Sequence, residues 1–205
     1  MEQPVPASAR LAGPRRTVLA DAALKVLSTH GPSGFTHRNV DDAAGLPHGS
    51  VNYYAPTRAR LWDLALNELF DQDFAVAAEW FNLESTDTVP GRSELVDRMV
   101  GFIAAMTTGE ARARVVARHH LLGQAQHDQS LREAFDIRRE GFMAFATHYI
   151  QRVNPGASLA VVEAAVTLLD GFMTRQVIIG RSALPKPVLR EAFEVFVRES
   201  EPAAE

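Results

Sequence analysis

The stretch GLPHGSVNYY, residues 45–54, holds two glycines, a proline and a serine within six residues and then becomes β-branched and aromatic. The residues before it, 36–44, offer a threonine N-cap and the spacing of an amphipathic helix that stops at Gly45. Pro47 suits the first turn of a following helix, 47–54, because its missing N–H costs no hydrogen bond there. Two short helices joined by a tight glycine turn predict a helix-turn-helix motif.

The rest of the chain repeats the helical spacing of apolar residues and shows no alternating strand pattern. Glycine, proline and polar stretches separate the periodic segments. The sequence therefore predicts an all-α protein. Its further helices are expected at residues 15–30, 58–82, 92–107, 110–126, 130–152, 158–181 and 186–199.

Composition restricts the kinds of protein that the chain can be. The absence of cysteine among the 205 residues excludes disulfides, thiolate zinc sites and cysteine nucleophiles. The N-terminus lacks the apolar core of a signal peptide, and no apolar run approaches the ~20 residues that span a bilayer, so we expect a cytoplasmic protein. Residues 1–60 carry seven Lys/Arg against four Asp/Glu, whereas the remainder carries 14 against 21. A basic end on an acidic body favours a nucleic-acid-binding module attached to another domain.

The second helix of the motif has the side chains that a recognition helix needs. A recognition helix meets base edges at its N-terminal end, where Gly49 and Ser50 permit close approach and His48 and Asn52 can exchange hydrogen bonds. Arg38, on the preceding helix, can reach a guanine or a phosphate. Residues at the flanking helix ends are placed to meet the DNA backbone. The expected DNA contacts are Thr36, His37, Arg38, His48, Gly49, Ser50, Asn52, Tyr53, Tyr54, Thr57 and Arg58.

A family resemblance supports this interpretation. RRTVLADAALKVL (residues 15–27) and GFTHRNVDDAAGLPHGSVNYYAPTRARLWDLAL (34–66) resemble the DNA-binding domain of the TetR, or tetracycline-repressor-like, family of transcriptional regulators. Asn52 stands where the family often has a phosphate-binding tyrosine, Tyr54 replaces a histidine, and Ala55 replaces a core phenylalanine. The resemblance implies base contacts from Arg38, His48, Gly49 and Ser50, and backbone contacts from His37, Tyr54 and Arg58.

The resemblance also implies that the chain is divided into functional domains. We expect a disordered N-terminal arm at 1–14, a three-helix DNA-binding domain at 15–57, and a larger helical effector-binding and dimerisation domain at 58–200, whose first helix, 58–82, connects the two. The family's activity would make the protein a homodimeric repressor that a small-molecule effector releases from a palindromic operator.

The segment 159–179 is apolar on nearly every side, which requires burial on all sides. In a chain of this size that predicts a subunit interface as well as a core, although an ordinary monomer core would give the same pattern. Family members pair their last two helices with those of a two-fold mate. The expected interface residues are Leu169, Phe172, Met173, Leu189, Phe193 and Phe196.

The middle helices carry large apolar side chains among a few polar ones, a mixture typical of ligand cavities and also of ordinary cores. TetR-like proteins place an effector pocket in this region, so we expect a small, largely apolar effector there. The candidate ligand contacts are Phe102, Met106, His120, Gln124, Phe142, Phe145, Tyr149 and Asp170.

Other classes of function find less support. His119, His120 and His127 diverge around a helix, and Asp41 and Asp42 are expected to face solvent, so we expect no metal site. The sequence has no nucleophile elbow and no phosphate loop, so we expect neither an enzyme nor a cofactor, and no membrane partner. The alternative is an all-α small-molecule-binding protein or enzyme in which the helix-turn-helix is only scaffold.

Overall fold

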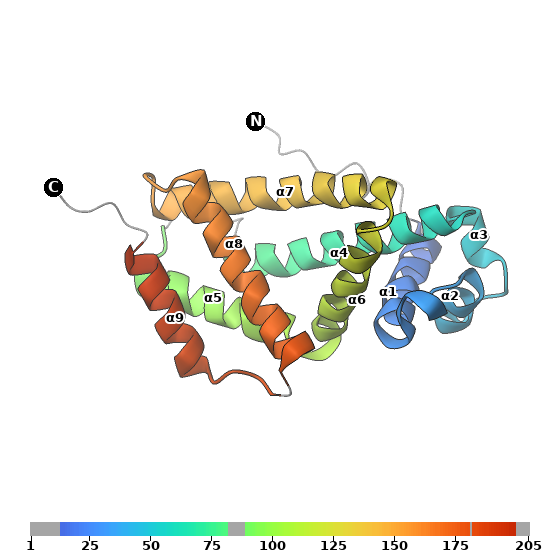
Figure 1. Cartoon of the computed structure of the whole chain (residues 1–205), viewed down its shortest axis with the longest axis horizontal. Helices are drawn as coiled ribbons and strands as arrows, with labels where there is room; N and C mark the ends of the chain where they lie inside the picture. The colour runs from blue at the N-terminus through green and yellow to red at the C-terminus, as the bar shows by residue number, and fades with distance from the viewer. Residues whose placement is uncertain (1–12, 82–88, 181, 200–205) are drawn as a thin grey trace. The chain divides into compact units, whose positions relative to one another are not determined.

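The computed structural model describes residues 13–81, 89–180 and 182–199, and all regular structure within these ranges is helical (Figure 1). The all-α prediction is confirmed. None of the described helices is long and apolar enough to cross a membrane. The elements are α1 (Pro14–Gly34), α2 (His37–Ala44), α3 (Ser50–Tyr54), α4 (Arg58–Phe81), α5 (Arg92–Met106), α6 (Gly109–Ala125), α7 (Gln129–Val153), α8 (Leu159–Thr174), the π-helical turn η2 (Arg175–Ile179) and α9 (Lys186–Glu199).

The helix-turn-helix forms where the sequence predicts it. Thr36 caps α2, with its hydroxyl oxygen accepting the N–H of Asn39 at 3.3 Å. Gly45 ends α2 in the left-handed region at φ 64°, a conformation that glycine adopts without strain. The second helix is shorter than expected. α3 begins at Ser50, and Pro47 belongs to the turn before it, where its carbonyl accepts the Ser50 N–H at 3.1 Å.

The first of two compact units contains the described residues up to Gln72 and the segment Val116–Asp136. Its core is built from the inward faces of α1, α2 and the start of α4. Phe35 packs against Trp62 with ring centroids 4.5 Å apart, and both side chains are fully or nearly fully buried. The parts of α6 and α7 within this unit complete the core; Phe135, for example, meets Phe70 edge-on at 5.1 Å.

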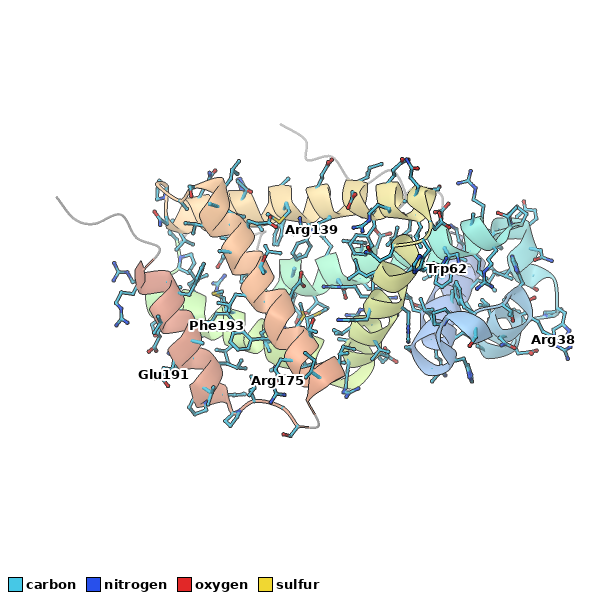
Figure 2. The ribbon with its side chains drawn as sticks, in the orientation of Figure 1. Arg38, Trp62, Arg139, Arg175, Glu191 and Phe193 are labelled. Atoms are coloured by element: carbon cyan, nitrogen blue, oxygen red, sulfur yellow. The ribbon has the colours of Figure 1, made fainter. Side chains whose placement is uncertain are left out.

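The second unit contains the described residues of Asp73–Val115 and those from Ile137 onward. α9 packs on α5 and α8 also contacts α5, as Figure 1 shows. Phe193 is fully buried and projects from α9 toward α8 (Figure 2), where its ring meets that of Phe172 at 5.3 Å. A buried ion pair joins α4 to α6, because the Arg114 Nε donates to Asp73 Oδ1 at 2.8 Å.

These units do not coincide with the functional division expected at residue 57. The difference arises because α4, α6 and α7 each contribute residues to both units. The boundaries at 15–57 and 58–200 describe expected functions rather than packing, and they stay a prediction. The expected disordered arm, 1–14, falls almost wholly outside the described residues.

Candidate functional site

Asp41 fastens α3 to α2. Its side chain is buried, with Oδ2 accepting the Gly49 N–H at 2.6 Å and Oδ1 accepting the Val51 N–H at 2.8 Å. The expectation that Asp41 faces solvent is wrong. The carboxylate can be buried because two backbone donors of the following segment satisfy it. Asp41 thereby sets the position of the α3 N-terminus, a role that helical periodicity alone does not reveal.

Arg38, Asp42 and His48 form an exposed cluster beside the start of α3. The His48 Nε2 lies 2.7 Å from Asp42 Oδ1, and the Arg38 Nε lies 4.0 Å from Asp42 Oδ2. Arg38 reaches from α2 to the surface, as Figure 2 shows, and its side chain is 76% exposed. Two of the side chains expected to contact bases, Arg38 and His48, therefore share one carboxylate, and both are accessible to another molecule.

The rest of the expected base-reading face is mixed in exposure. Gly49 is exposed with φ 94°, a left-handed conformation that favours glycine. Ser50 is half-buried and its hydroxyl donates to the Pro47 carbonyl at 2.6 Å. Asn52 is exposed, and Tyr53 is the most open of these side chains at 85%. Tyr54 is half-buried against the core of the first unit.

Residues expected to meet the DNA backbone also support the motif itself. The His37 Nε2 lies 2.7 Å from the Ala55 carbonyl oxygen, which ties the start of α2 to the end of α3. The Thr57 hydroxyl oxygen accepts the Arg60 N–H at 3.2 Å at the start of α4. Such roles are compatible with phosphate contact, but they give these residues a structural function that sequence reasoning did not assign.

Arg58 is engaged more extensively. Its guanidinium donates to the Phe35 carbonyl at 3.1 Å and to the Pro32 carbonyl at 3.0 Å. The same group lies 5.6 Å from the centre of the Trp62 ring, within the range of a cation–π contact. Arg58 thus joins α4 to the end of α1, and in this arrangement several of its donors are used within the chain.

A cavity of about 310 Å³ lies within the second unit, between α5, α7 and α8 and the ends of α4 and α9. Its wall is largely aromatic and aliphatic. Four of the eight candidate ligand residues line it: Phe102, Phe142, Phe145 and Tyr149. Phe81, Met99, Ala146 and Phe196 also line it and were missed, because their helical stripes look the same as those of core residues.

The hydroxyl of Tyr149 is a polar group in the cavity wall. The Arg98 guanidinium donates to the Phe81 carbonyl at 3.1 Å and to the Tyr149 hydroxyl oxygen at 3.5 Å, and it pairs with Glu94 at 2.5 Å. Burial raises the pKa of Tyr149, although the nearby Arg98 acts in the opposite direction. The hydroxyl therefore stays protonated at neutral pH and can donate to a ligand.

The other four candidate ligand residues lie away from this cavity wall. Met106 is fully buried, and Asp170 on α8 is not among the lining residues. His120 and Gln124 belong to the first unit. The His120 ring packs beside Gly31, and burial, together with His119, lowers its pKa. Among the described residues no three His, Asp or Glu side chains are grouped to hold a metal ion.

The expected interface residues divide between core and surface. Met173, Leu189 and Phe193 are buried within their own chain, and Leu169 lines the cavity. Phe172 and Phe196 border a shallow, mostly apolar surface groove along α8, and Phe196 also lines the cavity. Two charged residues, Glu163 and Arg175, also line this groove. Its small lining residues are Ala160, Ala164, Thr167 and Gly171. Apolar side chains occur both in the core and in the surface groove, so the apolar pattern of α8 and α9 does not distinguish the two.

A known protein family matches the C-terminal part of the sequence. Residues 90–199, more than half of the chain, match the family described as tetracyclin repressor-like, C-terminal domain. No curated protein matches the sequence.

Solved structures share the fold over nearly the whole chain. A member of the TetR family from Streptomyces coelicolor is 23% identical, with a TM-score of 0.68 over 90% of this chain and 98% of that one. A transcriptional regulator from a Rhodococcus species is 18% identical, with a TM-score of 0.69 over 90% and 95%. The multidrug binding protein EbrR, complexed with imidazole, is 21% identical, with a TM-score of 0.66 over 95% and 98%. The helix-turn-helix, the helical second unit and the match over residues 90–199 agree, and the chain belongs to the TetR, or tetracycline-repressor-like, family of transcriptional regulators.

Proposed function

We propose that the protein is a homodimeric transcriptional repressor that a small, largely apolar effector releases from a palindromic operator. The observation that carries this function is the helix-turn-helix in which Asp41 anchors the segment before α3 while Arg38, His48 and Asn52 stay exposed. Preorganised donors on a rigid motif suit base readout in a major groove. The role requires the protein to share a compartment with DNA, so we place it in the cytoplasm.

The side chains of the motif have distinct tasks in this function. Arg38 contacts a guanine through its paired terminal nitrogens, and His48, Ser50 and Asn52 contact neighbouring base edges. Thr36, His37, Tyr54, Thr57 and Arg58 lie at helix ends, where backbone N–H groups and side chains position phosphates. Arg58 also holds α4 to α1, so its contribution to DNA binding includes keeping the motif in shape.

The groove along α8 is the face that we assign to the second subunit. Its lining is mostly apolar, and further apolar side chains of the last helices are exposed nearby, including Leu159 at 69%, Ile179 at 71% and Val188 at 48%. A monomer would leave this surface in water, and pairing removes it. A two-fold dimer then presents two α3 helices to half-sites related by the same symmetry.

Gly171→Arg is expected to convert the dimer to monomers and to lower operator affinity. A Cβ at Gly171 meets nothing within 4 Å in its own chain, so the arginine fits the monomer but meets the partner in the groove. Gly141→Arg on α7 is the matched control, because that position is equally open and lies outside the groove. Sedimentation would refute the interface if both variants remained dimers.

The cavity is the site that we assign to the effector. Its volume of about 310 Å³ and its aromatic wall suit a small, largely apolar molecule, and Tyr149 offers one hydrogen bond. EbrR, which has the same fold, has been seen with malachite green and with ethidium. α4 contributes Phe81 to the cavity and Trp62 to the core of the first unit, so a ligand that shifts α4 can alter DNA binding.

The experiment that tests the function is selection of duplexes from a library of genomic fragments by the full-length protein, followed by gel shift at several salt concentrations. We expect retained fragments to share a two-fold symmetric sequence and binding to weaken as salt rises. Retention of no fragment above background would contradict the proposed function.

A further inference from the structure

Asp42 lies between two of the side chains that the proposed function assigns to base contacts, Arg38 and His48. Its Oδ1 is 2.7 Å from His48 Nε2, and its Oδ2 is 4.0 Å from Arg38 Nε. All three side chains are more than half exposed, at 76% for Arg38, 55% for Asp42 and 57% for His48. The cluster therefore stands on the open surface of the motif and is accessible to DNA.

Contacts of the backbone on both sides of the cluster determine its position. The buried Asp41 holds the Gly49 N–H at 2.6 Å, and Gly49 directly follows His48. Arg38 and Asp42 are one turn apart on α2, where side chains four residues apart are neighbours. Because both sides of the cluster are attached to anchored backbone, Asp42 stays within reach of both partners when the motif is folded.

Asp42 places a negative charge on the surface that faces DNA in the proposed function. A carboxylate at this place does not increase the affinity for DNA. Residues 36–57 contain one arginine, Arg38, and two aspartates, so this segment has a net charge of −1 with its histidines neutral. The charge of Asp41 is directed at two backbone N–H groups, whereas that of Asp42 faces solvent. Since the DNA backbone is anionic, this exposed carboxylate weakens binding to phosphates of any sequence.

The contacts of Asp42 leave the base-reading atoms of its partners available. Asp42 approaches Arg38 from the Nε side, so the two terminal nitrogens can still reach O6 and N7 of a guanine together. The His48 ring meets Asp42 through Nε2, so its Nδ1 stays available for a hydrogen bond with a base edge.

We propose that Asp42 is a specificity-determining residue of the DNA-binding surface. It orients Arg38 toward guanine and His48 toward a neighbouring base edge. Its charge lowers the affinity for every duplex, and only a duplex that supplies both contacts recovers that loss. The inference rests on the proposed function and adds to it a residue that sequence reasoning placed outside the DNA contacts. Its net effect on affinity is unfavourable, and its effect on discrimination is favourable.

The test compares full-length wild-type protein with Asp42→Ala and Asp42→Asn on two duplexes, the best one selected by wild type and a scrambled duplex of equal composition. We expect Asp42→Ala to bind the scrambled duplex more tightly and to reduce the ratio of the two affinities about tenfold. Asp42→Asn removes the charge but keeps an acceptor for His48, so it is expected to preserve more of that ratio than alanine does.

Asp63→Ala is the matched control. Asp63 belongs to the same unit, pairs with Arg60 at 3.3 Å, and its loss changes the net charge by the same amount. Its affinity ratio is expected to stay at the wild-type value. An unchanged ratio in Asp42→Ala, or an equal fall in both alanine variants, would overturn the role of Asp42. A wild-type protein that prefers no duplex over the scrambled one would overturn the proposed function as well.

Discussion

Asp41→Asn is expected to lower the free energy of unfolding by about 2–4 kcal/mol and to abolish sequence-specific DNA binding even where the variant is still folded. The carboxylate accepts two backbone N–H groups, from Gly49 and Val51, at 2.6 and 2.8 Å. An amide can accept at one oxygen only, and its NH₂ group faces a second donor, so one buried N–H loses its partner. The start of α3 then loses the anchor that positions His48 and Ser50.

Urea denaturation and DNA titration of the same preparations measure the two effects. Asp42→Asn is the control for stability, because Asp42 is exposed and its substitution is expected to change the free energy of unfolding by less than about 0.5 kcal/mol. Equal stability of Asp41→Asn and wild type would show that the buried contacts of Asp41 are not energetically important.

Ala146→Trp is expected to weaken effector binding at least about a hundredfold while leaving operator binding in the absence of effector near the wild-type level. Ala146 is buried in the cavity wall beside Val162 and Val166, so an indole there occupies space that the effector needs. Ala144→Trp is the matched control, because Ala144 is exposed on the same helix and does not line the cavity.

Ligands for this experiment come from a thermal-shift screen of small apolar compounds against wild-type protein. By linkage, a ligand that lowers operator affinity must itself bind more weakly to the operator complex by the same factor, and a coupling of ~1–3 kcal/mol is typical. Ligands that stabilise Ala146→Trp as strongly as wild type would show that the effector binds elsewhere.

The helices were predictable because their ends depend on local chemistry. Thr36 caps α2, and Gly45 ends it in the left-handed conformation that glycine permits. The start of α3 was missed because proline suits both the first turn of a helix and the turn before it, and Pro47 takes the second place.

The sites were less predictable because they depend on contacts between distant residues. Asp41 is buried because donors eight and ten residues later satisfy it, which its position on α2 does not show. His120 is a polar residue among apolar ones, as in many ligand pockets, yet it lies in the part of α6 that belongs to the first unit, beside Gly31. Phe193 and Phe196 share one apolar stripe, but only Phe196 reaches the groove.

The most direct test of the central claim, that the α2–α3 surface reads base sequence, is titration of wild type and Arg38→Ala with every single base-pair variant of the selected duplex. The Arg38 side chain is 76% exposed, so alanine is expected to remove a base contact without disturbing the fold. Wild type is expected to lose about 1–3 kcal/mol at positions repeated symmetrically in two half-sites. Arg38→Ala should become insensitive at one guanine of each half-site and keep its discrimination elsewhere. Parallel profiles for the two proteins at every position would contradict the account.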